Sequence, residues 1–237
     1  MTAVKARLAQ GTPCWVSLMT DDLEGAKEFY RALLGWEFEP GPSQLGAYVR
    51  ATLNGAKVAG LGVTPPGTGY PVEWTTYFAV DRADDVAQRV RECGGTVAVG
   101  PLQAEHAGRL AIAADVSGAV FGLWQGEEHP GWELVDVPGA PAWAELLTPD
   151  RSAGVFYDAV FGGHPERTVR PGDLRDGPPR WRVHFTVSDP DLTADQTVRL
   201  GGRVLLAPHD TDRGRVARLT DPQGGRFSVV APQPVGL

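Results

Sequence analysis

The stretch PCWVSLMTDDLEGAKEFYRALLGW, residues 13–36, decides the fold, because a near copy of it returns later in the chain. The copy is PAWAELLTPDRSAGVFYDAVFGG, residues 141–163, with one residue deleted inside its helical part. Each copy begins as an alternating strand, passes an Asp-bearing turn, continues as a helix with a Phe-Tyr pair and closes on glycine. A repeat of this kind predicts a fold built from repeated supersecondary units.

A second pair of repeats lies between and after these two copies. EWTTYFAV, residues 73–80, corresponds to WRVHFTV, residues 181–187, and the downstream frame CGGTVAVGP returns as LGGRVLLAP. Four units therefore follow one another in the order A, B, A′, B′. Each unit predicts a strand, a helix and further strands, which is a βαβββ arrangement and an α+β fold class.

The third copied unit, A′, is shorter than its counterpart. The chain runs 42 residues from Trp36 to Phe78 but only 22 from Gly163 to Phe185. About two strands are missing, and the polar, proline-rich stretch at 170–179 does not suit a replacement strand. The second domain is therefore expected to be truncated.

A change of pattern near the middle of the chain predicts the domain boundary. Prolines and glycines in GEEHPGWELVDVPGAP, residues 126–141, interrupt both the helical and the strand period. We expect a first domain of two units at 1–128, a linker at 129–139 and a second domain at 140–237. The charged linker region around Glu127, Glu128, His129 and Glu133 is expected to lie in solvent.

Composition excludes several functional classes. The 22 Lys and Arg against 29 Asp and Glu give a net charge of −7, which disfavours nucleic acid as a partner. No window is long and apolar enough for a membrane span or a signal peptide, so no membrane partner and a cytoplasmic location are expected.

The repeat and its motifs resemble the vicinal oxygen chelate superfamily, which includes glyoxalase I, bleomycin resistance proteins and extradiol dioxygenases. The openings PCWVSLMTDD with FYRALLGW and PAWAELLTPD with FYDAVFG resemble its tandem two-domain members, termed glyoxalase-like or hydroxylase-like. The resemblance implies paired βαβββ units that form two half-open, concave β-sheet barrels with helices outside. It leaves open whether unit A pairs with B or with B′.

The resemblance also implies positions for a divalent metal, and this chain departs from all of them. The first-strand ligand positions hold Trp15, Thr75, Trp143 and Arg182, and the last-strand positions hold Gly122 and Ser228. None of these is a usual donor to the metals that imidazole and carboxylate bind. We expect no metal and no other cofactor.

Strand alternation predicts which side chains face the concave side of each half-open barrel, which we call its cup. Residues two apart along a strand share a face. The concave set comprises Trp15, Ser17 and Met19, Thr75 and Tyr77, Trp143 and Glu145, Arg182 and His184. By the same alternation, Ala79, Leu147 and Thr186 are expected on this face at the strand ends. The opposite face, which includes Leu18 and Phe78, is apolar and suits packing against helices. The residues of the concave set, together with Trp124, are the candidate site residues.

Two chemistries fit these candidates. Glu145 and His184 are the candidate catalytic pair, as general acid and base, and the alternative is that they form a hydrogen-bonded pair with Arg182 that only polarises the cup. The aromatic residues Trp15, Tyr77, Trp124 and Trp143 could stack on a flat ligand, with Ser17, Met19, Thr75 and Arg182 as further ligand-binding residues, or they could simply fill the barrels.

The function that this pattern favours is metal-independent binding or processing of an aromatic or apolar small molecule. The first alternative is a glyoxalase- or dioxygenase-like enzyme (a lyase, isomerase or oxygenase) that uses Glu145 and His184 or an unpredicted divalent metal. A second alternative is a noncatalytic assembly module, and a homodimer is left open.

Overall fold

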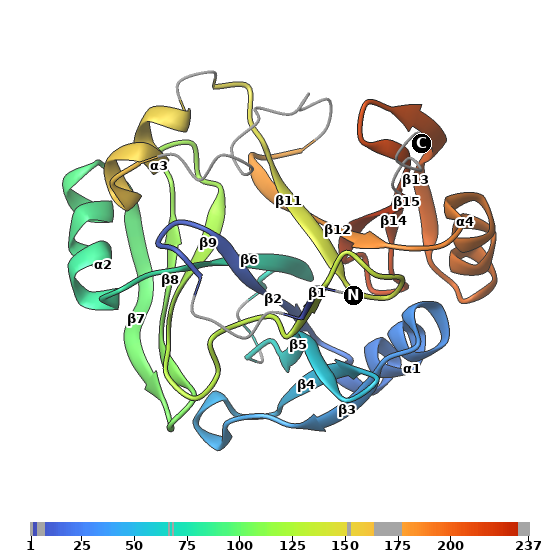
Figure 1. Cartoon of the computed structure of the whole chain (residues 1–237), viewed down its shortest axis with the longest axis horizontal. Coiled ribbons are helices and arrows are strands. Elements are labelled where there is room, and N and C mark those ends of the chain that lie inside the picture. Colours follow the sequence, from blue (N-terminus) through green and yellow to red (C-terminus); the bar gives the residue numbers. More distant parts are fainter. Residues whose placement is uncertain are drawn as a thin grey trace.

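The computed structural model describes residues 2–3, 8–65, 67, 69–150, 153–163 and 177–231 (Figure 1). Two large mixed β-sheets, of eight and five strands, and four α-helices make up this part of the chain. The α+β class and the truncated second half are thereby confirmed. Residues 164–176, which include most of the stretch in which strands were expected to be missing, lie outside the described residues.

The eight-stranded sheet is formed by the first half of the chain in the order β3-β4-β5-β2-β6-β9-β8-β7. Its strands are β2 (Pro13–Thr20), β3 (Glu37–Pro40), β4 (Tyr48–Leu53), β5 (Ala56–Val63), β6 (Glu73–Ala79), β7 (Thr96–Ala104), β8 (Gly108–Ala114) and β9 (Val120–Gly126). A short 3-10 helix, Ser43–Leu45, precedes β4. The sheet curls without closing, which leaves a concave face.

The five-stranded sheet is formed by the second half in the order β11-β12-β15-β14-β13. Its strands are β11 (Pro141–Leu147), β12 (Arg180–Thr186), β13 (Arg203–Thr211), β14 (Gly214–Thr220) and β15 (Arg226–Ala231). A separate two-stranded ribbon joins β1 (Thr2–Ala3) to β10 (Leu134–Val135).

The register shows which repeat units pair. Strand β2 of unit A runs antiparallel to β6 of unit B, with Ser17 opposite Thr75. Strand β11 of A′ runs antiparallel to β12 of B′, with Glu145 opposite Arg182. Units therefore pair A with B and A′ with B′, which answers the question that the sequence left open.

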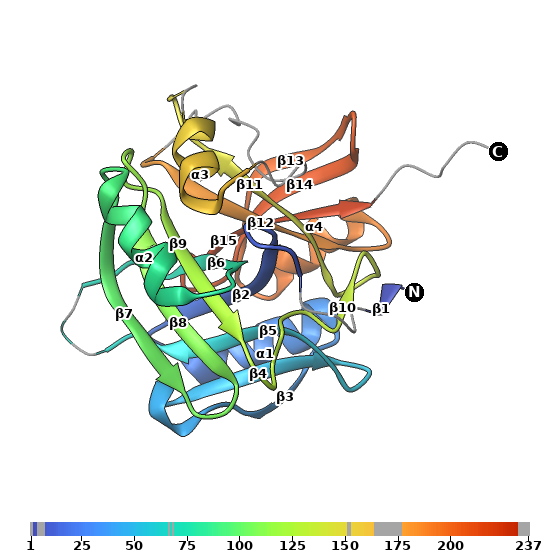
Figure 2. The ribbon, with the colours of Figure 1, turned by 60° about the vertical axis from the view of Figure 1, so that its left-hand side comes forward.

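The four helices are α1 (Leu23–Leu34), α2 (Ala83–Glu92), α3 (Ala153–Phe161) and α4 (Pro190–Arg199). Helix α1 begins where the Asp22 carboxylate accepts a hydrogen bond from the Gly25 amide, and it ends at Gly35, whose φ of 74° suits glycine. Figures 1 and 2 show α2 beside α3 and α1 beside α4, so each helix lies next to one from the other half of the chain.

The convex faces of the two sheets form the core, because the apolar side of each strand points there. Leu18 of β2 and Phe185 of β12 belong to one buried cluster with α1, and Phe78 of β6 belongs to the other with α2 and α3. This placement matches the helix-facing set expected from strand alternation. Because the core holds the convex faces together, both concave faces are left for cavities.

A buried polar contact, present twice, fixes the two halves of the chain to each other. The Tyr30 hydroxyl on α1 donates to the Asp221 carboxylate at 3.0 Å and accepts from the Trp74 indole at 3.1 Å. The same arrangement recurs with Tyr157, Asp115 and Trp181. Buried polar groups that satisfy one another in this way specify one docking geometry.

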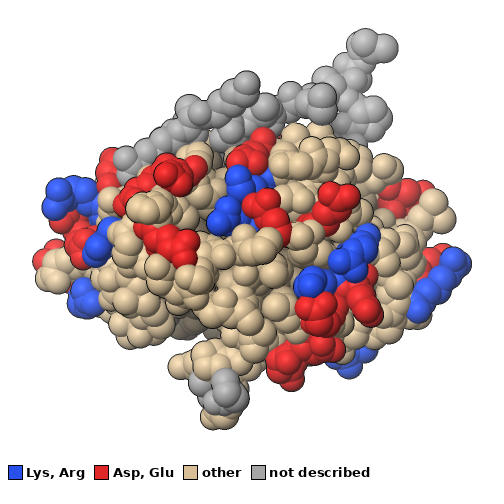
Figure 3. All heavy atoms as spheres, turned by 90° about the horizontal axis from the view of Figure 1, so that it is seen from below, with Lys and Arg blue, Asp and Glu red and all other residues tan. Residues whose placement is uncertain are grey.

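The molecular surface carries mixed charge. On the face shown in Figure 3, acidic and basic side chains lie among one another rather than in a patch of one sign. Within the described residues, no helix is long and apolar enough to cross a bilayer. The cytoplasmic location stays a prediction.

Candidate functional site

A cavity of about 850 Å³ lies on the concave face of the eight-stranded sheet. All six ligand-binding candidates of the first half line it: Trp15, Ser17, Met19, Thr75, Tyr77 and Trp124. Leu110 and Ile112 of β8 extend the apolar wall. The structure therefore brings these candidates together in one cup, while their role in binding stays a prediction.

The floor of this first cup is a small hydrogen-bonded group centred on Tyr48, which we did not predict. Its hydroxyl accepts from the Trp15 indole at 3.0 Å and is 2.8 Å from the Ser17 hydroxyl. The Tyr48 ring lies over Gly60, where no side chain competes for the space. Burial raises the pKa of Tyr48, so the phenol stays protonated and can donate to a ligand oxygen.

A second phenol covers the neighbouring part of the cup. The ring of Tyr77 lies over Gly122, its register partner on β9. Burial raises the pKa of Tyr77, so this group also stays neutral. Gly122 is the position at which the superfamily resemblance implies a metal-binding glutamate, and here the space is occupied by an aromatic ring.

The imidazole of His129 lies against the wall of the first cup, contrary to the expectation that the linker region is solvated. The residue is 7% exposed, and its ring meets Trp15 edge-on with centroids 4.4 Å apart. Burial, followed by the charges of Arg50 and Lys57, lowers its pKa to about 4, so the ring is neutral at pH 7. Neither ring nitrogen has a hydrogen-bond partner among the described residues.

Charged groups lie where the first cup meets the second half of the chain. Glu73, Arg180 and Arg226 all line this end of the cavity. Burial raises the pKa of Glu73, although the charges of Arg226 and Arg180 oppose the shift. The first cup is thus apolar along most of its length and charged at one end.

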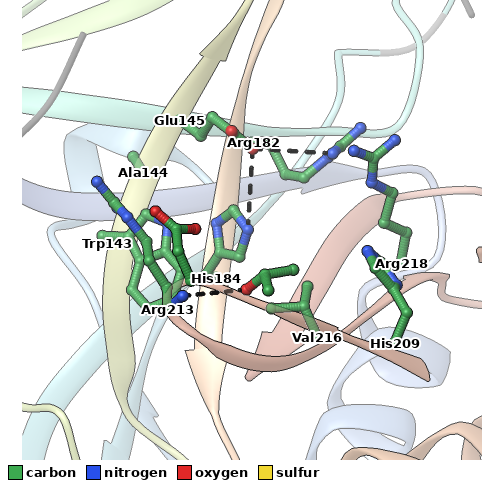
Figure 4. A pocket seen from close by; sticks show the side chains of 11 residues that line it. Trp143, Ala144, Glu145, Arg182, His184, His209, Arg213, Val216 and Arg218 are labelled. Carbon is green, nitrogen blue, oxygen red and sulfur yellow. Dashed lines mark hydrogen bonds and ion pairs between the residues drawn. The ribbon is translucent and has the colours of Figure 1, made fainter. Parts of the chain in front are cut away.

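A smaller cavity, of about 140 Å³, lies on the concave face of the five-stranded sheet. It is lined by the four second-half candidates: Trp143, Glu145, Arg182 and His184. Figure 4 shows Glu145 directed toward both Arg182 and His184. The nearest Glu145 oxygen is 3.9 Å from Arg182 Nη1 and 4.0 Å from His184 Nε2, so neither contact is a hydrogen bond.

The environment of His184 keeps its imidazole uncharged. Burial lowers its pKa well below the usual value, and the charges of Arg182, Arg213 and Arg218 lower it further. The ring stacks on Trp143, with centroids 4.6 Å apart and an interplanar angle of 20°. A base weakened in this way takes up a proton poorly at neutral pH.

The residues at the inherited metal positions do not fit a divalent cation. Trp15, Thr75 and Trp143 offer no imidazole or carboxylate, and Arg182 brings a positive charge. Ser228, on β15, is fully buried opposite His184. Among the described residues, no three His, Cys, Asp or Glu side chains are grouped so that they could hold a metal ion.

The family models match both halves of the chain. Residues 13–50 match a model described as bleomycin resistance protein-like N-terminal, and residues 128–230 match a glyoxalase-like domain. A protein of Mycobacterium bovis provisionally named the glyoxylase CFP32 is 40% identical, with 97% of this chain and 98% of the relative covered. The anthracycline biosynthesis protein DauV of a Streptomyces species is 37% identical, with 94% of each chain covered.

Solved structures of low sequence identity share the fold. The Mn(II)-bound glyoxalase of Novosphingobium aromaticivorans superposes with a TM-score of 0.63 at 17% identity, covering 97% of this chain and 87% of that one. The 2,3-dioxygenase LapB of a Pseudomonas species gives a TM-score of 0.63 at 15% identity, covering 98% and 97%. At these identities the likeness establishes the architecture alone.

Proposed function

Because the chain belongs to the vicinal oxygen chelate superfamily, we propose that it binds a planar, largely apolar small molecule in its first cup and does so without a metal. Its role is to bind, sequester or assist the processing of that compound. The observation that carries the proposal is the cavity of about 850 Å³ lined by Trp15, Tyr77 and Trp124. This volume lies in the range of pockets that enclose drug-sized ligands.

The polar groups of the first cup suit an aromatic compound with a few oxygen atoms. Tyr48 and Ser17 offer hydroxyl groups on the floor, while the surrounding walls are aromatic or aliphatic. Aromatic walls bind flat rings over a large area, and a few buried hydroxyls then fix the orientation. The name of the Streptomyces relative supports this ligand class, because anthracyclines are fused-ring aromatic compounds.

The metal-independent part of the proposal rests on the chemistry of the inherited positions. Tyr77 fills the space above Gly122, and Trp15 takes the place of a first-strand ligand. In the second cup the first-strand ligand position implied by the resemblance holds Arg182, whose positive charge would repel a cation. Ligand binding would then depend on packing and hydrogen bonds rather than on a metal acting as a Lewis acid.

The second candidate function is an enzyme that works through Glu145 and His184. The observation that favours it is that their nearest side-chain atoms are 4.0 Å apart in one cavity. A small movement would bring them to hydrogen-bond distance, which a general acid and base pair requires. An enzymatic activity that is lost in Glu145→Gln, while the first cup still binds its ligand, would identify Glu145 as part of the catalytic pair.

Titration with two matched probes tests the main proposal. We expect 1,8-dihydroxyanthraquinone to quench tryptophan fluorescence and to bind with micromolar affinity, on the order of 8 kcal/mol. Androstane-3,17-dione, a saturated four-ring compound of comparable size, should bind at least roughly tenfold more weakly because it cannot stack. Equal affinity for the two probes, or no binding of either, would contradict the proposal.

A further inference from the structure

The second cup is lined by more basic than acidic side chains, and the proposed function assigns no role to this excess of positive charge. Three guanidinium groups line it, those of Arg182, Arg213 and Arg218, against the carboxylates of Glu145 and Asp212. Leaving the imidazoles aside, the lining carries one net positive charge. A cavity with this balance attracts an anion and repels a metal cation.

Two of these guanidinium groups have no carboxylate partner within the described part of the chain. The Arg218 side chain makes neither a hydrogen bond nor an ion pair with the described residues, although its strand β14 runs along the cavity. The Arg213 guanidinium lies over the Trp143 ring, 5.1 Å from its centroid. Cationic groups gathered around a cavity without such partners are available to a bound anion.

Part of the cavity lining is buried, while the Arg213 and Arg218 side chains are half-buried. The side chains of Arg182 and His184 are only 6% and 5% exposed. In the view of Figure 4, Arg182 and Arg218 lie on one side of His184, and Trp143 and Arg213 lie on the other. The charge of the buried Arg182 is screened less by water than a charge at an exposed surface.

We propose that the second cup binds a small monocarboxylate, held by Arg218 on the side of His184 where Arg182 also lies. The cavity of about 140 Å³ is large enough for roughly five water-sized groups, which matches acetate or pyruvate. A guanidinium group pairs with a carboxylate through two parallel hydrogen bonds. Ala144 and Val216 supply an apolar side for a methyl group.

The carboxylate is favoured over phosphate by charge. A monoanion matches the single net positive charge of the lining, whereas phosphate carries close to two negative charges at neutral pH. The second negative charge would face Glu145 and Asp212, which line the same cavity. The site lies in the other sheet from the first cup, so this inference goes beyond the proposed function and does not depend on it.

Isothermal titration of the full chain with sodium pyruvate at pH 7.5 tests the inference. We expect one site with a dissociation constant on the order of 1 mM, and a loss of at least roughly tenfold in Arg218→Met because a charge-assisted hydrogen bond is removed. Arg215→Met is the matched control, since Arg215 lies on the same strand but pairs with Asp191 outside the cavity. Thermal unfolding of both variants shows whether they fold.

Each outcome of the titration decides the matter. Retained pyruvate binding in Arg215→Met and in Trp15→Ala, with weakened binding in Arg218→Met, supports the site and separates it from the first cup. Absence of pyruvate binding, or equal binding in Arg218→Met and the unmodified chain, overturns it. If inorganic phosphate binds in place of pyruvate and loses affinity in Arg218→Met, the carboxylate assignment is wrong.

Discussion

The phenol ring of Tyr77 lies directly over the backbone of Gly122, in the space that any side chain at that position would need. The two residues are register partners on the parallel strands β6 and β9. The backbone of Gly122 has no left-handed φ, so only the ring requires glycine here. The resemblance to the superfamily implies a metal-binding glutamate at this position, and the Tyr77 ring takes its space.

This relationship predicts a steric penalty for the smallest added side chain. Gly122→Ala should lower the free energy of unfolding by about 1–3 kcal/mol, because the new methyl group overlaps the Tyr77 ring. Urea denaturation measures the change. The control is Gly154→Ala on α3, where nothing lies within 4 Å of the new atom, and there we expect a gain of up to ~1 kcal/mol.

The steric origin of the penalty can be checked with a double variant. Combining Gly122→Ala with Tyr77→Ala should remove most of the cost of the first change, since the overlap disappears. An unchanged stability in Gly122→Ala alone would mean that Tyr77 does not pack there.

Metal content gives the second prediction. Purified protein should carry well under one equivalent of Fe, Mn, Ni or Zn, because no inherited position supplies a usual donor and Arg182 repels a cation. Elemental analysis after dialysis measures this, and EDTA should leave probe binding unchanged. About one equivalent of metal, lost with EDTA together with probe binding, would refute metal independence.

The buried imidazole of His129 predicts a pH dependence of stability. Its pKa falls from 6.5 in the unfolded chain to about 4 in the folded one. The unfolded chain therefore binds the extra proton first as the pH falls below 6.5, so stability is full above that pH and declines toward pH 4. We expect this group to remove roughly 2 kcal/mol between pH 7 and pH 5.

A variant isolates that contribution. In His129→Phe the free energy of unfolding from urea denaturation should fall less between pH 7 and pH 5 than in the unmodified chain, because the titrating group is gone. If both proteins lose the same stability over this interval, His129 is not buried as the structure places it.

Two neighbouring residues on opposite faces give the fourth prediction. Trp15→Ala should weaken binding of the anthraquinone probe by about 1–3 kcal/mol, since a cavity-lining aromatic contact is lost. Phe78→Ala should instead lower the free energy of unfolding by about 3–5 kcal/mol, because this ring is fully buried between the sheets. Fluorescence titration measures the effect on binding, and urea denaturation measures the effect on stability. If Phe78→Ala weakened binding and Trp15→Ala lowered the free energy of unfolding instead, the faces assigned to the two residues would be wrong.

Strand alternation and the repeat were enough to predict much of the fold and the position of the candidate residues. The alternation along β2 places Trp15 and Ser17 at the first cup and Leu18 in the core, as the structure has them. The shortened A′ unit predicted the smaller second sheet. These inferences are local, because the side-chain period of a strand does not depend on its neighbours.

The residues that were missed reach the cups through contacts distant in sequence. Tyr48 meets Trp15 only because β4 pairs with β5, which in turn pairs with β2. His129 looked like part of a charged linker, since its neighbours are acidic, yet the chain folds it against Trp15. The glycine at position 60 was a usable signal, because glycine within a strand often marks a close approach of another group.

The most direct test of the central claim is the structure of the chain crystallised with 1,8-dihydroxyanthraquinone in the presence of EDTA. The account predicts the probe inside the first cup, flat against Trp15, Tyr77 or Trp124, with a probe oxygen at hydrogen-bond distance from the Tyr48 hydroxyl. A probe bound outside this cavity, or one that enters it only when EDTA is replaced by a divalent metal bound to the chain, would contradict the claim.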